Sequence, residues 1–166
     1  PEAIKEWNSL LKEDSTRIDI LIGLAKCYKA TNRNHHAMQC YRKAKSLSPE
    51  NKYFHLQYIR SLLATEEYDK ARDECQAWIE QDTTSASAYY LLGMAYEGLS
   101  IEYPDSLDDT YIAYKEAYLR DSKDAQTVAR LAAILNDVEQ YKEAVKITEN
   151  YRLSDTTDIN VNRQNA

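Results

Sequence analysis

The sequence predicts an all-α protein built as a solenoid of stacked helical hairpins. Three observations support this prediction. Only 3 Gly and 3 Pro occur among 166 residues, so helices are rarely interrupted. Apolar residues recur three and four positions apart, as they do on one face of a helix. The same apolar pattern then returns after about 34 residues, and a fixed period of this length indicates a repeat architecture.

The pattern is clearest between residues 18 and 51. One apolar helical face precedes the polar break "TNRN", a second face follows it, and Pro49 ends the unit. The first face holds Leu21, Leu24, Ala25 and Tyr28, and the second holds Ala37, Tyr41 and Ala44. Small residues let neighbouring helices approach closely, and the large residues between them fill the grooves. A single hairpin cannot bury such faces by itself, so the units are expected to stack.

The same register recurs in three further segments, 52–85, 86–124 and 125–158. Matching steps hold Tyr58, Leu62, Ala71 and Cys75 in the first, Tyr89, Leu92, Tyr114 and Ala117 in the second, and Leu131, Leu135 and Ala144 in the third. The segment 86–124 also carries an insertion near 99–109. We expect Asp105 or Ser106 to cap the helix that follows, with Asp109 in its first turn. The insertion is either a tolerated loop extension or a second contact surface.

The two ends of the chain fit parts of the same repeat. Residues 1–17 match the second helix of a partial repeat, with Ala3 and Trp7 at the expected steps. Residues 159–166 are either a polar tail or the start of a further repeat. In the second alternative, Ile159 stands where the next repeat's first helix would begin, and Ala166 stands where that helix would carry its small residue. We then expect the chain to belong to a longer array.

Charge and composition disfavour several classes of function. The net charge of −6 lacks the basic footprint that nucleic acids and anionic membranes require. No apolar run approaches the roughly 18 residues needed to insert into a bilayer. Three cysteines, none in a CxxC pair, indicate free thiols rather than a disulfide scaffold. This pattern favours a reducing compartment such as the cytoplasm, and a periplasmic location stays open if a signal peptide precedes the segment.

Two adjacent histidines and a cysteine, in "NHHAMQC", raise the question of a metal site. His36 and Cys40 lie four positions apart, so a helix would place them on one side. No fourth donor, HExxH motif or CxxC pair accompanies them, so we expect His35 and His36 to be ordinary surface residues at a helix start, with no metal. No GxSxG, GxGxxG or other glycine-rich phosphate loop occurs either, so we expect neither an enzyme nor a bound cofactor.

At "LIGLAKCY…CYRKAKSLSP" and "YYLLGMAY…YKEA" the sequence resembles the tetratricopeptide repeat family. The resemblance covers about residues 1–153. It implies a right-handed superhelical solenoid of antiparallel helix pairs, which serves protein binding. Trp78 and Tyr151 depart from the family pattern, because they stand where the family has a small residue. The packing at these two positions is therefore expected to be looser or rearranged.

The resemblance also implies that the first helix of each repeat lines a concave groove. The positions that would face this groove combine cations with aromatic, apolar and amide side chains. They are Lys26, Lys29, Tyr53, Leu56, Gln57, Arg60, Tyr90, Met94, Gln126 and Arg130. Acids at the same steps are fewer, namely Asp19, Glu97 and Asp137. Such a surface suits a protein or peptide that carries acids and apolar anchors.

We therefore predict a protein-interaction scaffold that binds a peptide or protein segment in its groove. The alternative is a structural assembly element that forms homo-oligomers through its end faces. Nucleic acid and direct membrane insertion are not expected. One variant of the family clamps the acidic tail of a chaperone with Lys, Asn, Asn, Lys and Arg. Those steps hold Ile22, Lys26, Gln57, Ser87 and Leu91 here, so this clamp is not expected either.

Overall fold

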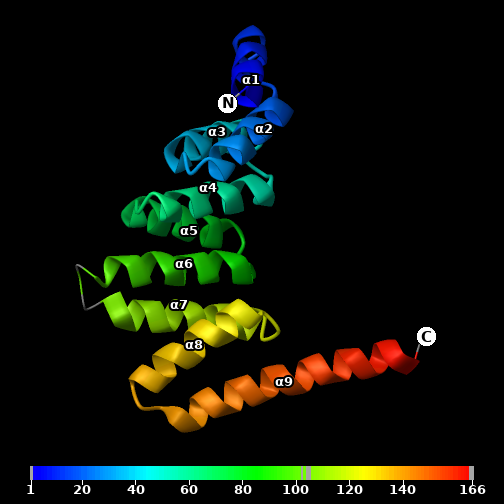
Figure 1. Ribbon diagram of the computed structural model, residues 1–166. Coiled ribbons are helices and arrows are strands. Elements are labelled where there is room, and N and C mark those ends of the chain that lie inside the picture. The colour runs from blue at the N-terminus through cyan, green and yellow to red at the C-terminus, as the bar shows by residue number, and fades with distance from the viewer. Residues whose placement is uncertain (1, 102, 104–105, 165–166) are drawn as a thin grey trace. The chain divides into compact units, whose positions relative to one another are not determined.

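The computed structural model describes residues 2–101, 103 and 106–164, and every regular element among them is an α-helix. This result confirms the all-α prediction. The helices are α1 (Glu2–Glu13), α2 (Ile18–Ala30), α3 (Asn34–Leu47), α4 (Lys52–Ala64), α5 (Tyr68–Gln81), α6 (Ala86–Leu99), α7 (Ser106–Arg120), α8 (Ala125–Asp137) and α9 (Tyr141–Gln164) (Figure 1). No helix in the described part of the chain is both long enough and apolar enough to cross a membrane.

The chain divides into two compact units, residues 1–74 and 75–166. In the first unit α2 packs against α1 and α3, and α3 packs against α4. The core of this unit joins large apolar residues with alanines. Fully buried members are Ile20, Leu21, Leu24, Ala25, Ala37, Tyr41, Ala44, Ile59 and Leu62. The alanines allow close helix approach, and the large residues fill the space between the backbones.

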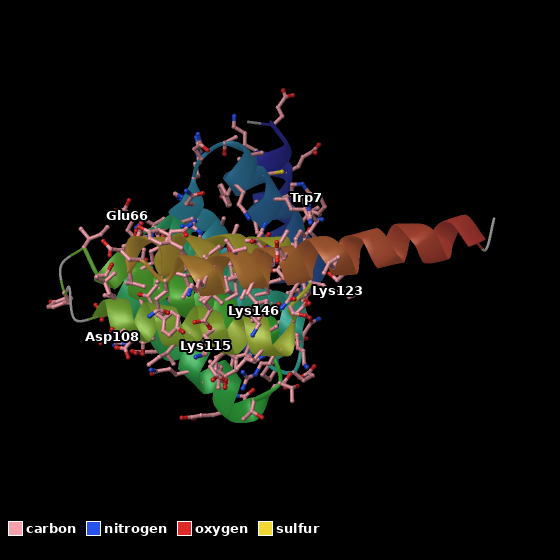
Figure 2. All side chains as sticks on the ribbon, turned by 90° about the horizontal axis from the view of Figure 1, so that it is seen from below. Trp7, Glu66, Asp108, Lys115, Lys123 and Lys146 are labelled. Atoms are coloured by element: carbon pink, nitrogen blue, oxygen red, sulfur yellow. The ribbon has the colours of Figure 1, made fainter. Side chains whose placement is uncertain are left out.

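Trp7 shows how α1 joins this unit. The indole lies against Gly23 of α2, where an added Cβ would come within 3.0 Å of the Trp7 ring (Figure 2). Glycine at this position therefore gives the ring room to lie on the α2 backbone. Ala3, which the sequence pairs with Trp7, has no described side chain.

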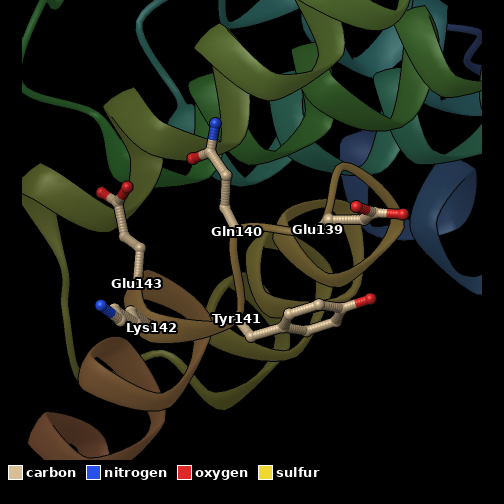
Figure 3. Close-up of a pocket in the computed structure, with 5 residues that line it drawn as sticks. All are labelled: Glu139, Gln140, Tyr141, Lys142 and Glu143. Carbon is tan, nitrogen blue, oxygen red and sulfur yellow. The ribbon is translucent and has the colours of Figure 1, made fainter.

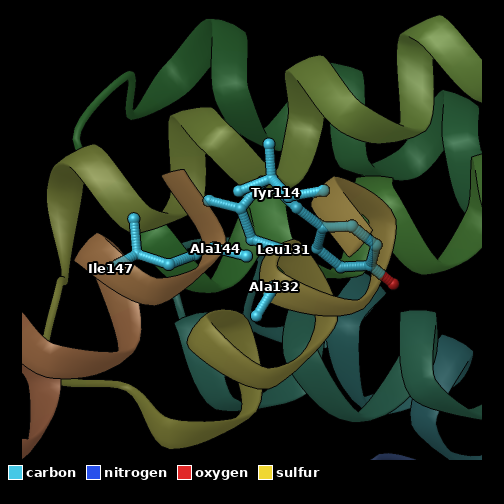
Figure 4. Packing of buried hydrophobic residues seen from close by; sticks show 6 residues of the cluster. Tyr114, Leu131, Ala132, Ala144 and Ile147 are labelled. Carbon is cyan, nitrogen blue, oxygen red and sulfur yellow. The ribbon is translucent and has the colours of Figure 1, made fainter. Parts of the chain in front are cut away.

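In the second unit α6 packs against α7, α7 against α8, and α8 against α9. A buried cluster from α7, α8 and α9 fills the space between these helices. It consists of Tyr114, Leu131, Ala132, Leu135, Ala144 and Ile147 (Figure 4). Tyr90 and Met94 of α6 pack against its edge and are half-buried. Trp78 is buried as well, so the large residue that departs from the family pattern is accommodated inside the protein.

The first helix of each expected repeat begins where the sequence places the repeat boundary, at Ile18, Lys52, Ala86 and Ala125. Side chains just before three of these helices act as N-caps. The Asn51 side chain accepts a hydrogen bond from the Tyr53 amide, Ser85 from the Ala88 amide, and Asp124 from the Thr127 amide. Each cap satisfies one of the backbone donors that a helix start leaves open, and thereby fixes where the helix begins.

Three of the first helices, α2, α4 and α8, end with the same backbone motif. Asn32, Glu66 and Glu139 have positive φ angles of 56°, 60° and 60°. In each turn the next residue donates a backbone hydrogen bond across the helix end: Arg33 to the Tyr28 carbonyl (2.9 Å), Glu67 to Leu62 (3.0 Å) and Gln140 to Leu135 (2.7 Å). This arrangement is the Schellman motif, which closes a helix and reverses the chain. In contrast, α6 ends at Ser100 with φ in the right-handed helical region, and the insertion follows.

Two of the sequence-based predictions concern the insertion and the end of the chain. The helix after the insertion begins at Ser106 and carries Asp108 and Asp109 in its first turn, while Asp105 lies outside the described residues. The last helix, α9, runs without a break from Tyr141 to Gln164. It therefore passes through residue 158, where the sequence pattern ends the fourth repeat, and includes Ile159; Ala166 lies outside the described residues.

Candidate protein-binding surfaces

The first unit presents six of the predicted groove residues on α2 and α4. We call this set the α2–α4 surface; it comprises Lys26, Lys29, Tyr53, Leu56, Gln57 and Arg60. On α4 the residues lie three and four positions apart, so they share one helical face. The two lysines, Tyr53 and Arg60 are exposed, while Leu56 and Gln57 are half-buried.

The cations of the α2–α4 surface have no acidic partner among the residues that the structure describes. Within the described part of the chain, Lys26, Lys29 and Arg60 make no ion pair and no side-chain hydrogen bond. Each cation is exposed and therefore hydrated, but none is neutralised by a neighbour. An acidic ligand could pair with them without first breaking an internal salt bridge.

Tyr53 is the aromatic member of this surface, and its ring contacts Phe54. Its ring lies edge-on to Phe54, with ring centroids 5.7 Å apart. Burial raises the pKa of the Tyr41 hydroxyl to about 12, and interaction with the Tyr53 hydroxyl adds to this shift. The Tyr53 ring contacts Phe54 while 43% of the residue stays exposed. A positioned aromatic side chain loses little entropy when a partner covers it.

The second unit presents the other four predicted residues on α6 and α8. We call this set the α6–α8 surface; it comprises Tyr90, Met94, Gln126 and Arg130. Unlike the first set, it includes two residues, Tyr90 and Met94, that pack against the core. The Tyr90 and Tyr114 rings lie 5.7 Å apart, and Met94 packs on the same cluster. Gln126 and Arg130 are exposed on α8.

Glu97 joins the α6–α8 surface to the core. Its Oε1 accepts from the Arg130 guanidinium at 2.6 Å, and its Oε2 accepts from the buried Tyr114 hydroxyl at 2.8 Å. Burial is the main cause that raises the pKa of Tyr114, and the bond to Glu97 adds to it. The Glu97 charge in turn raises the pKa of Arg130. The guanidinium is therefore held in place, but its charge is largely balanced.

The sequence identified Glu97 only as an acid at a position expected to face the groove. It did not predict these contacts. The pairing depends on the side-chain positions of Glu97 on α6, Tyr114 on α7 and Arg130 on α8. Helical periodicity gives the face on which each residue lies, but it does not give the partner across helices. As a result, the mildly basic character expected for the whole groove is concentrated in the α2–α4 surface.

The histidine and cysteine stretch lies at the start of α3. His35 and His36 are exposed, and the His36 ring stacks on Tyr28 with centroids 4.9 Å apart. Cys40 is buried, and this burial raises the pKa of its thiol to about 11, so the thiol stays protonated at neutral pH. Among the described residues no group of three or more His, Cys, Asp or Glu lies close enough to hold a metal ion.

A hollow of about 400 Å³ lies at the turn between α8 and α9, lined by Glu139, Gln140, Tyr141, Lys142 and Glu143 (Figure 3). The lining comes from five consecutive residues rather than from several elements. Gln140 and Glu143 point in the same direction at a distance from each other, and Tyr141 points away from both, so the three side chains do not converge on one ligand atom (Figure 3). We assign no binding role to this hollow.

Comparison with known proteins identifies the repeat. Residues 18–51 match the tetratricopeptide repeat family model. A crystal structure of MamA is similar to 95% of this chain and 89% of its own, with a TM-score of 0.74 and 20% identity. A MamA segment from Desulfovibrio magneticus RS-1 gives 0.73 at 18% identity, covering 94% of this chain and 85% of that one.

Two further structures extend this likeness. TTC0263, described as a thermophilic TPR protein in Thermus thermophilus, gives a TM-score of 0.68 at 13% identity, covering 81% of this chain and 73% of its own. The first TPR domain of human RPAP3 gives 0.62 at 15% identity, covering 76% and 96%. No curated protein matches the sequence. Residues 18–51 are thus a tetratricopeptide repeat, and the chain as a whole is a protein of the tetratricopeptide repeat fold.

Proposed function

We propose that this chain is a non-catalytic scaffold that binds a protein or peptide segment through the α2–α4 surface. The observation that carries the proposal is the set of three exposed cations, Lys26, Lys29 and Arg60, that lack an acidic partner in the described part of the chain. Tetratricopeptide repeats as a class present extended surfaces for protein binding. A ligand with acidic residues would match these cations, and an apolar anchor would cover Tyr53 and Leu56.

The α6–α8 surface is a weaker contributor in this proposal. Arg130 already pairs with Glu97, and Tyr90 and Met94 already pack against the core. A ligand carboxylate would have to compete with Glu97 for the guanidinium. We therefore propose that the α2–α4 surface, and not Arg130 or Gln126, supplies most of the affinity.

Charge reversal tests the proposal without disturbing the core. The variant Lys26→Glu, Lys29→Glu, Arg60→Glu is compared with the control Lys5→Glu, Lys142→Glu, Lys146→Glu. All six positions are exposed, and both variants change the net charge equally. Proteins captured from native lysate are quantified by mass spectrometry. A set that the parent and the control retain and the α2–α4 variant loses would support the proposal. Equal retention by all three would refute it.

Self-association is the second candidate function, and one observation on α9 favours it. Met38 of α3 is only 7% exposed. Met38 lies four residues after the start of α3, and Val145 lies four residues after the start of α9. Val145 is nevertheless 54% exposed. A second copy could cover this face. Sedimentation at increasing protein concentration, repeated with Val145→Glu, tests this candidate: a dimer that the substitution abolishes supports it, and a monomer throughout refutes it.

A further inference from the structure

The turn between α6 and α7 differs from the other hairpin turns of the chain. α6 ends at Ser100 without the Schellman ending, and the inserted segment follows. Its backbone is nevertheless tied at both sides. The Tyr103 amide donates to the Leu99 carbonyl at 2.9 Å, and the Ser106 amide donates to the Tyr103 carbonyl at 3.0 Å. The backbone of Tyr103 is therefore bonded both to the end of α6 and to the start of α7.

Large apolar side chains are exposed in and beside this turn. Ile101, Tyr103 and Leu107 are 81%, 59% and 57% exposed, and no large apolar side chain among the described residues is more exposed than Ile101. The turns at Asn32 and Glu66 carry polar residues instead. Single exposed apolar residues are ordinary on a protein surface, but three in and directly beside one turn are the pattern of a contact site.

The same stretch is strongly acidic. Between residues 97 and 114 the sequence has five acids, Glu97, Glu102, Asp105, Asp108 and Asp109, and no Lys, Arg or His. Asp108 and Asp109 are exposed in the first turn of α7, where acids also stabilise a helix start (Figure 2). Helix stabilisation accounts for these two aspartates, but it does not account for the exposure of Ile101 and Tyr103.

We propose that Ile101, Tyr103, Leu107, Asp108 and Asp109 form a docking site for a basic protein segment with apolar side chains. We call these five residues the turn patch. Charge complementarity selects this partner: the acids attract Lys or Arg, and the three apolar side chains cover the ligand's own apolar residues. The site is opposite in sign to the α2–α4 surface, so it serves a different partner and does not depend on the function proposed above.

Peptide selection on the whole chain tests this docking site. Phage-displayed random peptides of about a dozen residues are selected against the chain, and one enriched basic peptide is synthesised with a fluorescent label. The expected peptides carry net positive charge and at least one aromatic or aliphatic residue. Their affinity should fall as salt rises, because exposed charge pairs are screened. Failure to enrich such peptides would overturn the proposal.

Variants then locate the site. Ile101→Ser, Tyr103→Ser, Leu107→Ser should weaken binding of the labelled peptide by about 10-fold or more, and Asp108→Asn, Asp109→Asn should weaken it less and reduce its salt dependence. The control Leu119→Ser, Val138→Ser, Leu153→Ser alters other exposed apolar residues and should leave binding unchanged. Equal binding to all variants would place the peptide elsewhere and overturn the proposal. So would oligomers of the parent chain that only the turn-patch variant disrupts, because a second copy would then be the occupant.

Discussion

At the scale of single residues, the Tyr114 ring lies directly against Gly93. A Cβ added at Gly93 would lie 2.7 Å from two atoms of the Tyr114 ring, which is closer than side chains pack. The ring cannot move away easily, because it is fully buried and its hydroxyl is bonded to Glu97. Gly93 is therefore required by the size of its neighbour and not by its own backbone angles.

The substitution Gly93→Ala should destabilise the protein. Overpacking costs about 1–3 kcal/mol, and the better helix propensity of alanine offsets at most about 1 kcal/mol. We expect the free energy of unfolding in urea to fall by about 1–2 kcal/mol. In the background Tyr114→Leu the same substitution should cost much less, since the ring is gone. An equal cost in both backgrounds would show that the contact with Tyr114 is not the cause.

At the scale of helices, the turns that close α2, α4 and α8 carry a residue with positive φ. Glycine adopts this conformation without strain, whereas Glu66 and Glu139 do not. Glu66 is exposed at the tip of its turn, and the bond that closes the turn comes from the backbone of Glu67 (Figure 2). Its side chain is therefore not needed for the turn.

Glu66→Gly should stabilise the protein by about 0.5–1 kcal/mol, because glycine relieves the strain at positive φ. The exposed control Asp69→Gly, inside the first turn of α5, should instead cost about 1 kcal/mol. Thermal and urea unfolding measure both. A loss of stability in the Glu66 variant would mean that this glutamate makes a contact worth more than the strain.

Arg120 links the end of α7 to the turn before α6. Its Nε donates to the Thr83 carbonyl at 2.6 Å, its Nη1 donates to Glu116, and its guanidinium lies 3.8 Å above the Tyr89 ring. Lysine keeps the charge but cannot reproduce this fork. Arg120→Lys should therefore lower the free energy of unfolding by about 1–2 kcal/mol.

A matched arginine tests whether this loss is specific to the link. Arg42 is exposed on α3, so Arg42→Lys should change stability by less than about 0.5 kcal/mol. Urea unfolding of both variants gives the comparison. Similar losses at the two positions would argue that a general property of the arginine side chain matters, and not the geometry at Thr83 and Tyr89.

At the scale of the whole molecule, the sequence predicted the helical class and the starts of the first helices, because both follow from periodicity and turn residues. Ile18 and Ala125, for example, begin apolar runs that follow polar stretches. The Glu97–Tyr114–Arg130 contacts could not be predicted in this way, because they depend on how neighbouring helices rotate against each other. For the same reason the sequence could not show that Tyr90 and Met94 pack on the core.

The pH dependence of stability should be set by different residues at its two ends. Below about pH 4 the relevant groups are exposed carboxylates. Hydrogen bonds from Thr16 lower the pKa of Asp14, a hydrogen bond from Arg17 lowers that of Asp19, and one from Lys70 lowers that of Glu67. Their stabilisation is present above the pKa of the unfolded chain and is lost as pH falls through the lower folded values. Because these groups are exposed, the loss should be shallow.

At high pH buried acids dominate; Tyr114 is one of them, and Cys40 and Tyr41 are two more. Burial raises the pKa values of Cys40 and Tyr41 to about 11 and about 12, above the values of 9.0 and 10.0 for the unperturbed side chains. A raised folded pKa stabilises the protein fully below the unfolded value, and the stabilisation is lost as pH rises through the folded one. The thermal midpoint should therefore fall steeply between about pH 9 and pH 11. In Cys40→Ala the thermal midpoint should begin to fall about one pH unit higher, near the unperturbed pKa of Tyr41. Circular dichroism melts across this range measure the effect, and an identical alkaline limb in the variant would exclude Cys40 as its cause.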